Sequence, residues 1–226
     1  MSLEQQILDR LDRLYPHRDA DKLLTQCKDA LGEPEPAADS TKWSERDAVL
    51  ISYPDQIADG DRAPLAVLEN ILQEMGQVFS TIHILPFYPS SSDRGFAVID
   101  HRVVDHRFGS WANISSISST HQVMADLVLN HVSSSHRWVE EFRADIESGR
   151  SCLKTASLDD DVSAVVRPRT SDLLVPCETT TGIKYLWCTF GPDQVDLDWE
   201  EPEVLLEMLR VIDALLRAGI RWFRLD

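Results

Sequence analysis

The chain has 226 residues, 43% of them hydrophobic and 27% charged, a length that is enough for one good-sized hydrophobic core. Its formal net charge of −16 argues against a nucleic-acid partner, because phosphate backbones are bound by basic surface. No apolar run approaches the ~20 residues that span a membrane, and the N-terminus lacks the basic and apolar segments of a signal peptide. We therefore expect no membrane partner and a cytoplasmic location.

The four cysteines, at positions 27, 152, 177 and 188, are scattered along the chain. They form no CxxC pair and have no metal-ligand spacing, which indicates free thiols. We therefore expect neither a metal nor a cofactor. The acidic balance does not exclude a small anionic substrate, since one or two arginines in a pocket can bind phosphate.

A helical hairpin is predicted over residues 1–31. Apolar residues recur at helical spacing on both sides of a Tyr-Pro break, first Leu3, Ile7, Leu8, Leu11 and Leu14, then Leu23, Leu24, Cys27 and Leu31. Such a hairpin needs another surface to cover its apolar side. Residues 32–42 follow, and their Pro-, Glu- and Ala-rich composition predicts a linker.

Strands and helices are predicted to alternate from residue 43 to residue 226. Short apolar runs at 47–53, 81–85, 123–129 and 220–225 predict strands, and 64–75 and 203–217 predict helices. The serines in 115–119 weaken the helix expected before the third strand. Alternating elements of this kind indicate an α/β fold made of about four βα units with a parallel sheet. Continuous apolar strands fit a sheet that is buried on both faces.

Two features suggest that these units are the N-terminal half of an eight-stranded (β/α)8 barrel. The last strand ends Arg224-Leu225-Asp226, which is how a barrel strand presents charged side chains at its C-terminal rim, where catalytic residues lie. No helix follows that strand to cover it. Between the third and fourth strands, residues 132–202 include a helix near 135–146 and a long irregular stretch. A segment of this length predicts a loop subdomain above the rim.

Polar residues gather at the ends of the predicted strands: Asp93, Asp126, Asn130, His131, Arg224 and Asp226. Asp126 and Asn130 are four residues apart, so on one strand they would share a face and could satisfy each other. Taken singly, each residue has an ordinary explanation. His131 could be a structural histidine, Asp93 a turn residue bonded to its own backbone, and Asp226 an accident of the chain end. Their order and spacing together favour a catalytic site.

These motifs resemble the α-amylase family, glycoside hydrolase family 13, and within it the sucrose phosphorylase branch. The resemblance covers about residue 43 to the end, and the predicted helical hairpin resembles the longer glucosylglycerate phosphorylases of that branch. The stretches that carry it are 85–109 with LPFYPSSSDRGFAVIDH, 126–131 with DLVLNH, 185–190 with YLWCTF, 193–198 with DQVDLD, and 224–226 with RLD.

The resemblance implies a role for each candidate residue. Asp226 would be the catalytic nucleophile, and Arg224 would orient it and keep it ionised. Asp93 would hydrogen-bond the hydroxyls of the transferred glucose, Phe96 would stack on that sugar, and His131 would contact the same ring. Asp126 and Asn130 would be structural residues near the site. Asp196 and its neighbours would belong to the loop subdomain.

The implied reaction is phosphorolysis of an α-glucoside through a covalent glucosyl-enzyme. Retaining glycosidases use two carboxyl groups about 5–5.5 Å apart, and the family's acid/base glutamate lies beyond the fourth strand. We therefore expect this chain to be inactive alone. Glu178, Glu200, Glu201 and Glu203 are expected to be solvated acids. A half barrel also has two open sheet edges, so we expect it to be unstable or to need the missing C-terminal half as a partner.

Other interpretations remain open from the sequence. The acceptor could be water or a sugar, which would make the enzyme an α-glucosidase or a transglucosidase. The chain could also be a non-catalytic truncated product, or an unrelated α/β protein with chance matches. The glucoside could be sucrose, sucrose phosphate, glucosylglycerate or glucosylglycerol.

Overall fold

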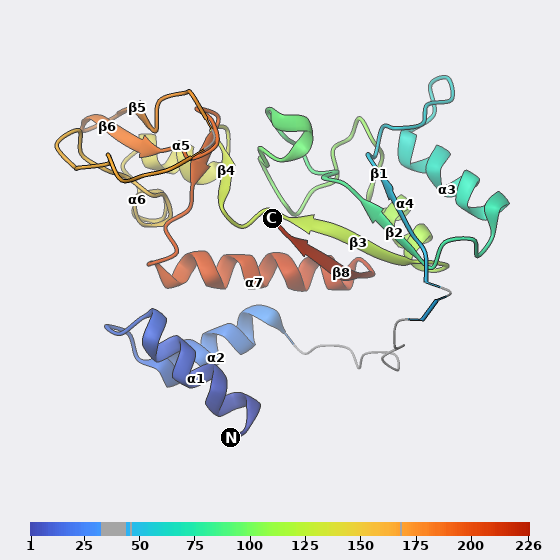
Figure 1. The fold of residues 1–226 in the computed structure, drawn as a ribbon, viewed down its shortest axis with the longest axis horizontal. Coiled ribbons are helices and arrows are strands. Elements are labelled where there is room, and N and C mark those ends of the chain that lie inside the picture. The colour runs from blue at the N-terminus through green and yellow to red at the C-terminus, as the bar shows by residue number, and fades with distance from the viewer. Residues whose placement is uncertain (33–43, 46, 168) are drawn as a thin grey trace.

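A four-stranded parallel sheet organises the second part of the chain in the computed structural model, which describes residues 1–32, 44–45, 47–167 and 169–226 (Figure 1). The strands are β1 (Val49–Ser52), β2 (Thr81–Ile84), β3 (Gln122–Leu127) and β8 (Ile220–Leu225), in the order β1-β2-β3-β8, and each neighbouring pair is parallel. The predicted parallel βα sheet is thus confirmed. Apart from Gly32, the predicted linker over 32–42 lies outside the described residues.

Three helices pack on one face of this sheet: α3 (Pro64–Met75), α4 (Trp111–Ser118) and α7 (Pro202–Arg217). The serine-rich segment therefore does form a helix, because Ile114 and Ile117 are fully buried against the sheet. Core side chains of β2 and β3 alternate with residues that point to the opposite face. That opposite face carries His83, Met124 and Trp222, which lie side by side in the strand register.

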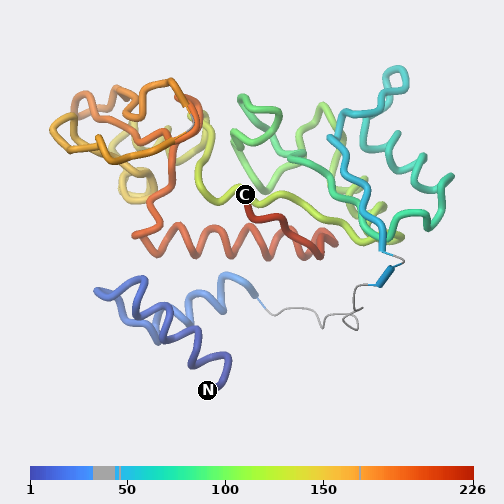
Figure 2. The backbone as a smooth tube through the Cα atoms, in the orientation of Figure 1, coloured from blue at the N-terminus to red at the C-terminus, as the bar shows by residue number. Residues whose placement is uncertain are grey.

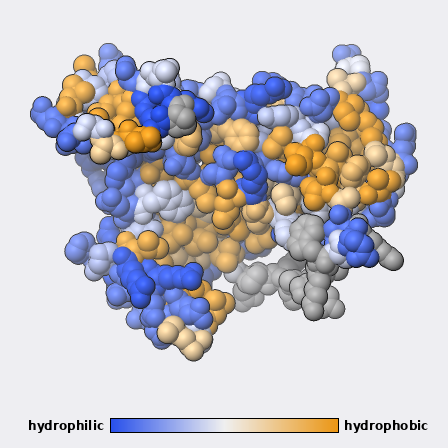
Figure 3. All heavy atoms as spheres, viewed as in Figure 1, coloured by the Kyte–Doolittle hydropathy of each residue, from blue (hydrophilic) through white to orange (hydrophobic). Residues whose placement is uncertain are grey.

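The two outer strands are open. In the sheet as described, β1 and β8 each have a strand neighbour on one side only. Ile51 on β1 is 61% exposed and Leu225 on β8 is 68% exposed. Figure 3 shows apolar surface over β1 and around β8 on the face in view. Unpaired edges next to exposed apolar side chains are typical of a surface that another chain segment covers.

Residues between β3 and α7 form a lobe beside the sheet (Figure 2). The lobe contains β4 (His131–Ser133), α5 (Arg137–Arg143), α6 (Glu147–Cys152), β5 (Leu174–Thr179), β6 (Gly182–Trp187) and β7 (Gln194–Asp196). β4 pairs with β7 and β5 with β6, both antiparallel. The helix predicted over 135–146 is wrong in extent, because Asp145 adopts a left-handed backbone with φ 59° and separates α5 from α6. The division into separate domains stays a prediction.

The N-terminal hairpin consists of α1 (Leu3–Leu14) and α2 (Ala20–Leu31). Ser2 is the N-cap of α1 and Asp19 is the N-cap of α2. The side-chain oxygen of each accepts a hydrogen bond from a backbone N–H of the first turn. The hairpin packs on α7, where Leu206 joins a cluster with Leu11, Tyr15, Leu23 and Leu24. The surface that the hairpin needs is therefore the outside of α7. Among the described residues, no helix is both long and apolar enough to cross a bilayer.

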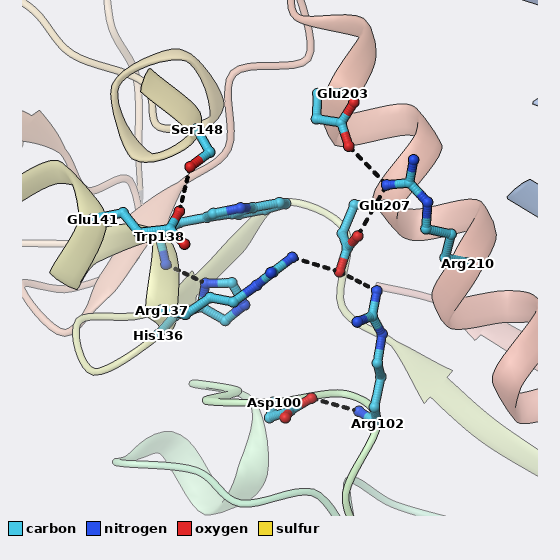
Figure 4. A network of polar contacts seen from close by, with 10 residues as sticks. All are labelled: Asp100, Arg102, His136, Arg137, Trp138, Glu141, Ser148, Glu203, Glu207 and Arg210. Atoms are coloured by element: carbon cyan, nitrogen blue, oxygen red, sulfur yellow. Dashed lines mark hydrogen bonds and ion pairs between the residues drawn. The ribbon is translucent and has the colours of Figure 1, made fainter. Parts of the chain in front are cut away.

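A buried glutamate ties the lobe to α7 and to the loop after β2 (Figure 4). Glu207 Oε1 accepts hydrogen bonds from Arg102 and from Arg137, the latter at 2.9 Å, and Oε2 accepts one from Arg210 at 3.2 Å. The Glu207 side chain is 10% exposed, whereas the three arginines are 40–53% exposed. The carboxylate is therefore the shared partner of three elements that are distant in sequence.

Replacing Glu207 by glutamine is expected to lower the free energy of unfolding by about 1–3 kcal/mol, because a buried acceptor of charged donors is lost. The loss of stability stays in this range because the guanidinium groups of the half-exposed arginines can be hydrated once they lose the carboxylate. Glu203→Gln is the matched control, since Glu203 is 48% exposed and contacts Arg210 alone among the three. We expect that control to change stability by less than about 1 kcal/mol. Equal urea midpoints for the two variants would contradict a hub role for Glu207.

Two buried histidines predict acid sensitivity. Burial lowers the pKa of His101 and the pKa of His136 to about 4 each, from an ordinary value of 6.5. The unfolded chain therefore binds these protons at higher pH than the folded chain does. Stability is present above pH 6.5 and is lost as the pH falls toward 4, by about 1.4 kcal/mol per pH unit for each histidine.

His101→Asn is expected to remove one such contribution to the slope of unfolding free energy against pH. His106→Asn is the control, because its side chain is 95% exposed. Urea titrations of the two variants at several pH values between 4 and 6.5 check this prediction. Parallel pH curves for His101→Asn and the unmodified protein would show that His101 is not held neutral.

Candidate active site

Asp126 is the centre of the polar group at the carboxyl ends of the strands. It lies near the end of β3, is fully buried, and its Oδ2 lies 2.9 Å from His83 Nε2 while its Oδ1 accepts from Arg224 at 2.5 Å. The backbone carbonyl of Asp126 accepts from the Tyr88 hydroxyl at 3.1 Å. A buried carboxylate requires such partners, so three elements are fixed to one another here.

Arg224 connects this buried carboxylate to Asp226. One terminal nitrogen bonds Asp126 and the other lies 2.6 Å from Asp226 Oδ1. The hydrogen bond with Asp126, followed by the charges of Asp126 and Asp226, raises the pKa of Arg224, so this guanidinium stays charged. The backbone also holds Asp226, because Asp226 N–H donates to Leu127 O at 3.1 Å and Leu129 N–H donates to Asp226 O at 3.0 Å. The Asp226 carboxylate is thereby oriented and remains 28% exposed.

Asp93 and His131 meet through Gln194. Gln194 Nε2 donates to Asp93 Oδ2 at 2.9 Å and lies 3.0 Å from His131 Nε2. His131 Nε2 also lies 3.1 Å from Phe96 O, and the second ring nitrogen, Nδ1, is buried and has no hydrogen-bond partner among the described residues. Burial lowers the pKa of His131, against the opposing effect of Phe96 O and of the nearby carboxylates, which include Asp226 and Asp93. The imidazole is therefore neutral at pH 7 and can serve as a polar contact.

Aromatic rings border the same region. The guanidinium carbon of Arg224 lies 5.7 Å from the centroid of the Phe96 ring, and the Phe190 ring lies 5.3 Å from that of His131. Phe96 follows a short 3-10 turn, η1 (Asp93–Gly95), in the loop after β2. The structure thus brings Asp93, Phe96, His131, Arg224 and Asp226 to one rim of the sheet.

The expected pairing of Asp126 with Asn130 is wrong. β3 ends at Leu127, so Asn130 lies beyond the strand and shares no strand face with Asp126. Asp126 contacts His83 and Arg224 instead. Asn130 bonds through its backbone to the residue after β7, because Leu197 N–H donates to Asn130 O at 2.9 Å.

Sequence reasoning missed three residues that touch the candidate residues: His83, Phe190 and Gln194. His83 had a usable signal, since an ionisable residue in the middle of the apolar strand Thr81–Ile84 needs a buried partner. Gln194 and Phe190 lie in the lobe. No hydrophobic periodicity in the sequence predicts that the lobe packs over the rim. Their contacts could be found only from the structure.

The arrangement suits a positively charged or electron-poor ligand atom near Asp226, with hydroxyl groups bound around it. Asp93 and Gln194 offer acceptors and donors for hydroxyls, and Phe96 and Phe190 offer apolar faces. Within the described residues, no group of three His, Cys, Asp or Glu side chains is placed to hold a metal ion.

Comparison with known proteins shows which enzymes resemble this chain. Residues 53–226 match the family model described as alpha amylase, catalytic domain. The chain is 41% identical over 225 residues to a glucosylglycerate phosphorylase from Allomeiothermus silvanus, covering 99% of this chain and 40% of that protein. It is 35% identical over 230 residues to a glucosylglycerate phosphorylase from Escherichia coli strain K12, covering 99% and 41%.

Among solved structures, the sucrose 6F-phosphate phosphorylase from Thermoanaerobacter thermosaccharolyticum superposes with a TM-score of 0.74 at 26% identity, over 86% of this chain and 42% of that one. The chain thus spans about two fifths of the length of the relatives it matches. Its four parallel strands, with α3, α4 and α7 packed on them, form the N-terminal half of a (β/α)8 barrel, as expected. The match to the family model extends over most of the sequence and includes the whole polar rim, so the chain belongs to the α-amylase family of glycoside hydrolases.

Proposed function

We propose that this chain supplies the nucleophile side of a retaining α-glucoside phosphorylase. Asp226 attacks the anomeric carbon of an α-glucoside, and the glucosyl group then passes to inorganic phosphate. The observation that carries this proposal is the bridge in which Arg224 joins the buried Asp126 to the partly exposed Asp226. Such a bridge orients the carboxylate and places a positive charge beside it, which suits a nucleophile.

The reaction has two displacements at one carbon. In the first, Asp226 Oδ forms a bond to the anomeric carbon while the bond to the leaving oxygen breaks, and a general acid protonates that oxygen. In the second, a phosphate oxygen attacks the same carbon and releases Asp226, yielding α-glucose 1-phosphate. Asp93, Gln194 and His131 hold the sugar hydroxyls, and Phe96 packs on the ring. Two inversions at the carbon give net retention.

The general acid is proposed to come from polypeptide that corresponds to the rest of the relatives' barrel. This polypeptide is also the proposed partner of the open sheet. Within the part of the chain that the structure describes, each outer strand has a neighbour on one side only, and Ile51 and Leu225 expose apolar surface there. We therefore propose that the 226-residue chain alone does not turn over substrate.

A chimera tests the function directly. Residues 1–226 are joined to the part of the A. silvanus glucosylglycerate phosphorylase that lies beyond the matched region, and the two parts are also co-expressed as separate chains. Purified proteins are incubated with glucosylglycerate, sucrose, sucrose 6-phosphate or glucosylglycerol, with and without phosphate. Glucose 1-phosphate and free glucose are measured separately.

We expect phosphate-dependent glucose 1-phosphate from the chimera and none from the 226-residue chain. The identity to two glucosylglycerate phosphorylases makes glucosylglycerate the first substrate to try. Free glucose released at the same rate without phosphate would assign the site to a hydrolase. Transfer to a second sugar without phosphate would assign it to a transglucosidase. Turnover by the chain alone would refute the proposed need for a partner.

A further inference from the structure

Asp193 lies just outside the candidate site and binds the loop that carries Asp93. Its Oδ2 accepts from Ser91 Oγ at 2.5 Å and from Ser92 Oγ at 2.6 Å, and its Oδ1 accepts from Ser134 Oγ. The backbone takes part as well, because Ser134 N–H donates to Asp193 O at 3.1 Å. One carboxylate therefore collects three hydroxyl donors from two segments that are distant in sequence.

The loop that these serines begin is strained. Asp93 and Arg94 have φ values of 53° and 51°, in the left-handed region that side chains avoid, and Gly95 follows at 109°. A Cβ at Gly95 would lie 2.8 Å from Pro86 O, so this position needs glycine. Backbone strain of this kind persists only where the surroundings fix it. The two serines stand directly before the strained residues, where they can fix them.

The next residue along the chain from Asp193 holds the first residue of the strained turn. Gln194 Nε2 donates to Asp93 Oδ2, and Gln194 is the first residue of β7, which pairs with β4. Asp193 and Gln194 thus bind the loop at Ser91, Ser92 and Asp93 from one short segment. The connection is reinforced by the hydroxyls of Ser91 and Ser133, which lie 2.5 Å apart.

We propose that Asp193 is a positioning residue, whose carboxylate clasps Ser91 and Ser92 and so holds Asp93 against the substrate site. It acts through the loop and touches no reacting atom. This inference rests on the proposed function for its effect on catalysis, while the clasp itself is a property of the loop.

The charge state of Asp193 agrees with this role. Burial raises the pKa of Asp193, but the hydrogen bonds from Ser134, Ser91 and Ser92 outweigh burial and hold the pKa below its ordinary value of 3.8. A depressed pKa means that the clasp contributes stability above that ordinary value and loses it as the pH falls through the lowered one. The carboxylate is therefore ionised, and accepts all three donors, at any pH where a phosphorylase would work.

The test uses Asp193→Asn in the chimera, with amide hydrogen exchange and steady-state kinetics on the same preparations. Asparagine keeps the shape of the side chain but loses the charge and one acceptor oxygen. We expect exchange in residues 91–97 to rise at least about tenfold while β3 keeps its protection, since only the loop opens. We expect kcat/KM for phosphorolysis to fall about 10²-fold, as for a small displacement of a binding group.

Two further variants separate positioning from general damage. Ser91→Thr with Ser92→Thr keeps both hydroxyls and is expected to retain protection of the loop and activity. Ser91→Ala with Ser92→Ala removes them and is expected to match Asp193→Asn, with no further loss when the two sets are combined. Asp161→Asn is the control, because Asp161 is exposed and its hydrogen-bond partner among the described residues is the nearby Ser163.

The outcomes are distinguishable. Unchanged exchange in 91–97, or additive losses from the two sets, would overturn the positioning role. Faster exchange throughout the barrel would overturn it too, because Asp193 would then be a general stabiliser. If the unmodified chimera shows no phosphorolysis but Asp193→Asn still frees the loop alone, the clasp stands and the proposed function fails.

Discussion

Replacing Asp226 by asparagine is expected to lower the rate of glucose 1-phosphate formation by the chimera at least about 10⁴-fold. The amide has nearly the same shape and size, but it carries no charge and is a poor nucleophile toward the anomeric carbon. The covalent glucosyl-enzyme then cannot form, and both displacements are lost. Initial rates with saturating glucoside and phosphate measure the effect.

The structure offers a matched control for this substitution. Asp213 also pairs with an arginine, Arg217, at 2.8 Å, and its side chain is 23% exposed, close to the 28% of Asp226. It lies on α7, away from the rim, so Asp213→Asn is expected to leave the rate within about twofold of the unmodified chimera. A comparable loss in both variants would mean that the fold and not the nucleophile had been tested.

Chemical rescue adds a second readout for Asp226. In Asp226→Ala, the removed side chain leaves room for a small external anion on the same face of the sugar. Azide added to this variant is expected to attack the anomeric carbon directly and give a glucosyl azide of inverted configuration. A single displacement inverts the carbon, whereas the two displacements of the intact site retain it. Rescue with retained configuration would place the nucleophile elsewhere.

The parallel sheet was predictable because its strands are short continuous apolar runs separated by strong helical patterns. The lobe was harder to predict from the sequence. β4 and β7 have three residues each, all buried, and β5 and β6 have six residues each of mixed burial, so neither pair leaves a clear alternation in the sequence. The break between α5 and α6 rests on the left-handed backbone of Asp145, a residue that is only somewhat tolerant of it.

The candidate residues were predictable as strand ends, but their partners were not. The reason is visible in the register of β3 and β8, where Val123 faces Ile220 and Met124 faces Trp222. One residue of β8 is skipped there, and this irregularity places Arg224 beside Asp126. Without the shift, Phe223 would stand opposite Asp126 and every following side chain would change face. A sequence pattern does not reveal a one-residue shift between strands about a hundred residues apart.

Asp126→Ala is expected to reduce the free energy of unfolding by about 3–5 kcal/mol, because it removes the fully buried carboxylate that pairs with the buried His83 and with the partly exposed Arg224. His83, whose side chain is 6% exposed, loses its side-chain hydrogen-bond partner among the described residues. Arg224 loses its ion pair with Asp126 and keeps the one with Asp226. The buried groups left without partners, more than the lost attraction itself, set the size of this effect.

Asp105→Ala is a control of the same residue type and similar burial. Asp105 is 4% exposed and bonds Arg107, whose side chain is 60% exposed and can return to water. We expect this control to cost about 1–2 kcal/mol and to leave activity per folded molecule unchanged. Urea titrations of the two chimeras at pH 7 give the stabilities, and activity is normalised to the folded fraction.

The comparison separates two contributions of Asp126. If it only stabilises the fold, the folded fraction of Asp126→Ala should work at the normal rate. If it also anchors Arg224, the freed guanidinium no longer fixes the Asp226 carboxylate, and activity per folded molecule should fall by about 10²-fold. A loss of stability below about 1 kcal/mol would contradict both, because a carboxylate that can be removed so easily is not the buried centre of this rim.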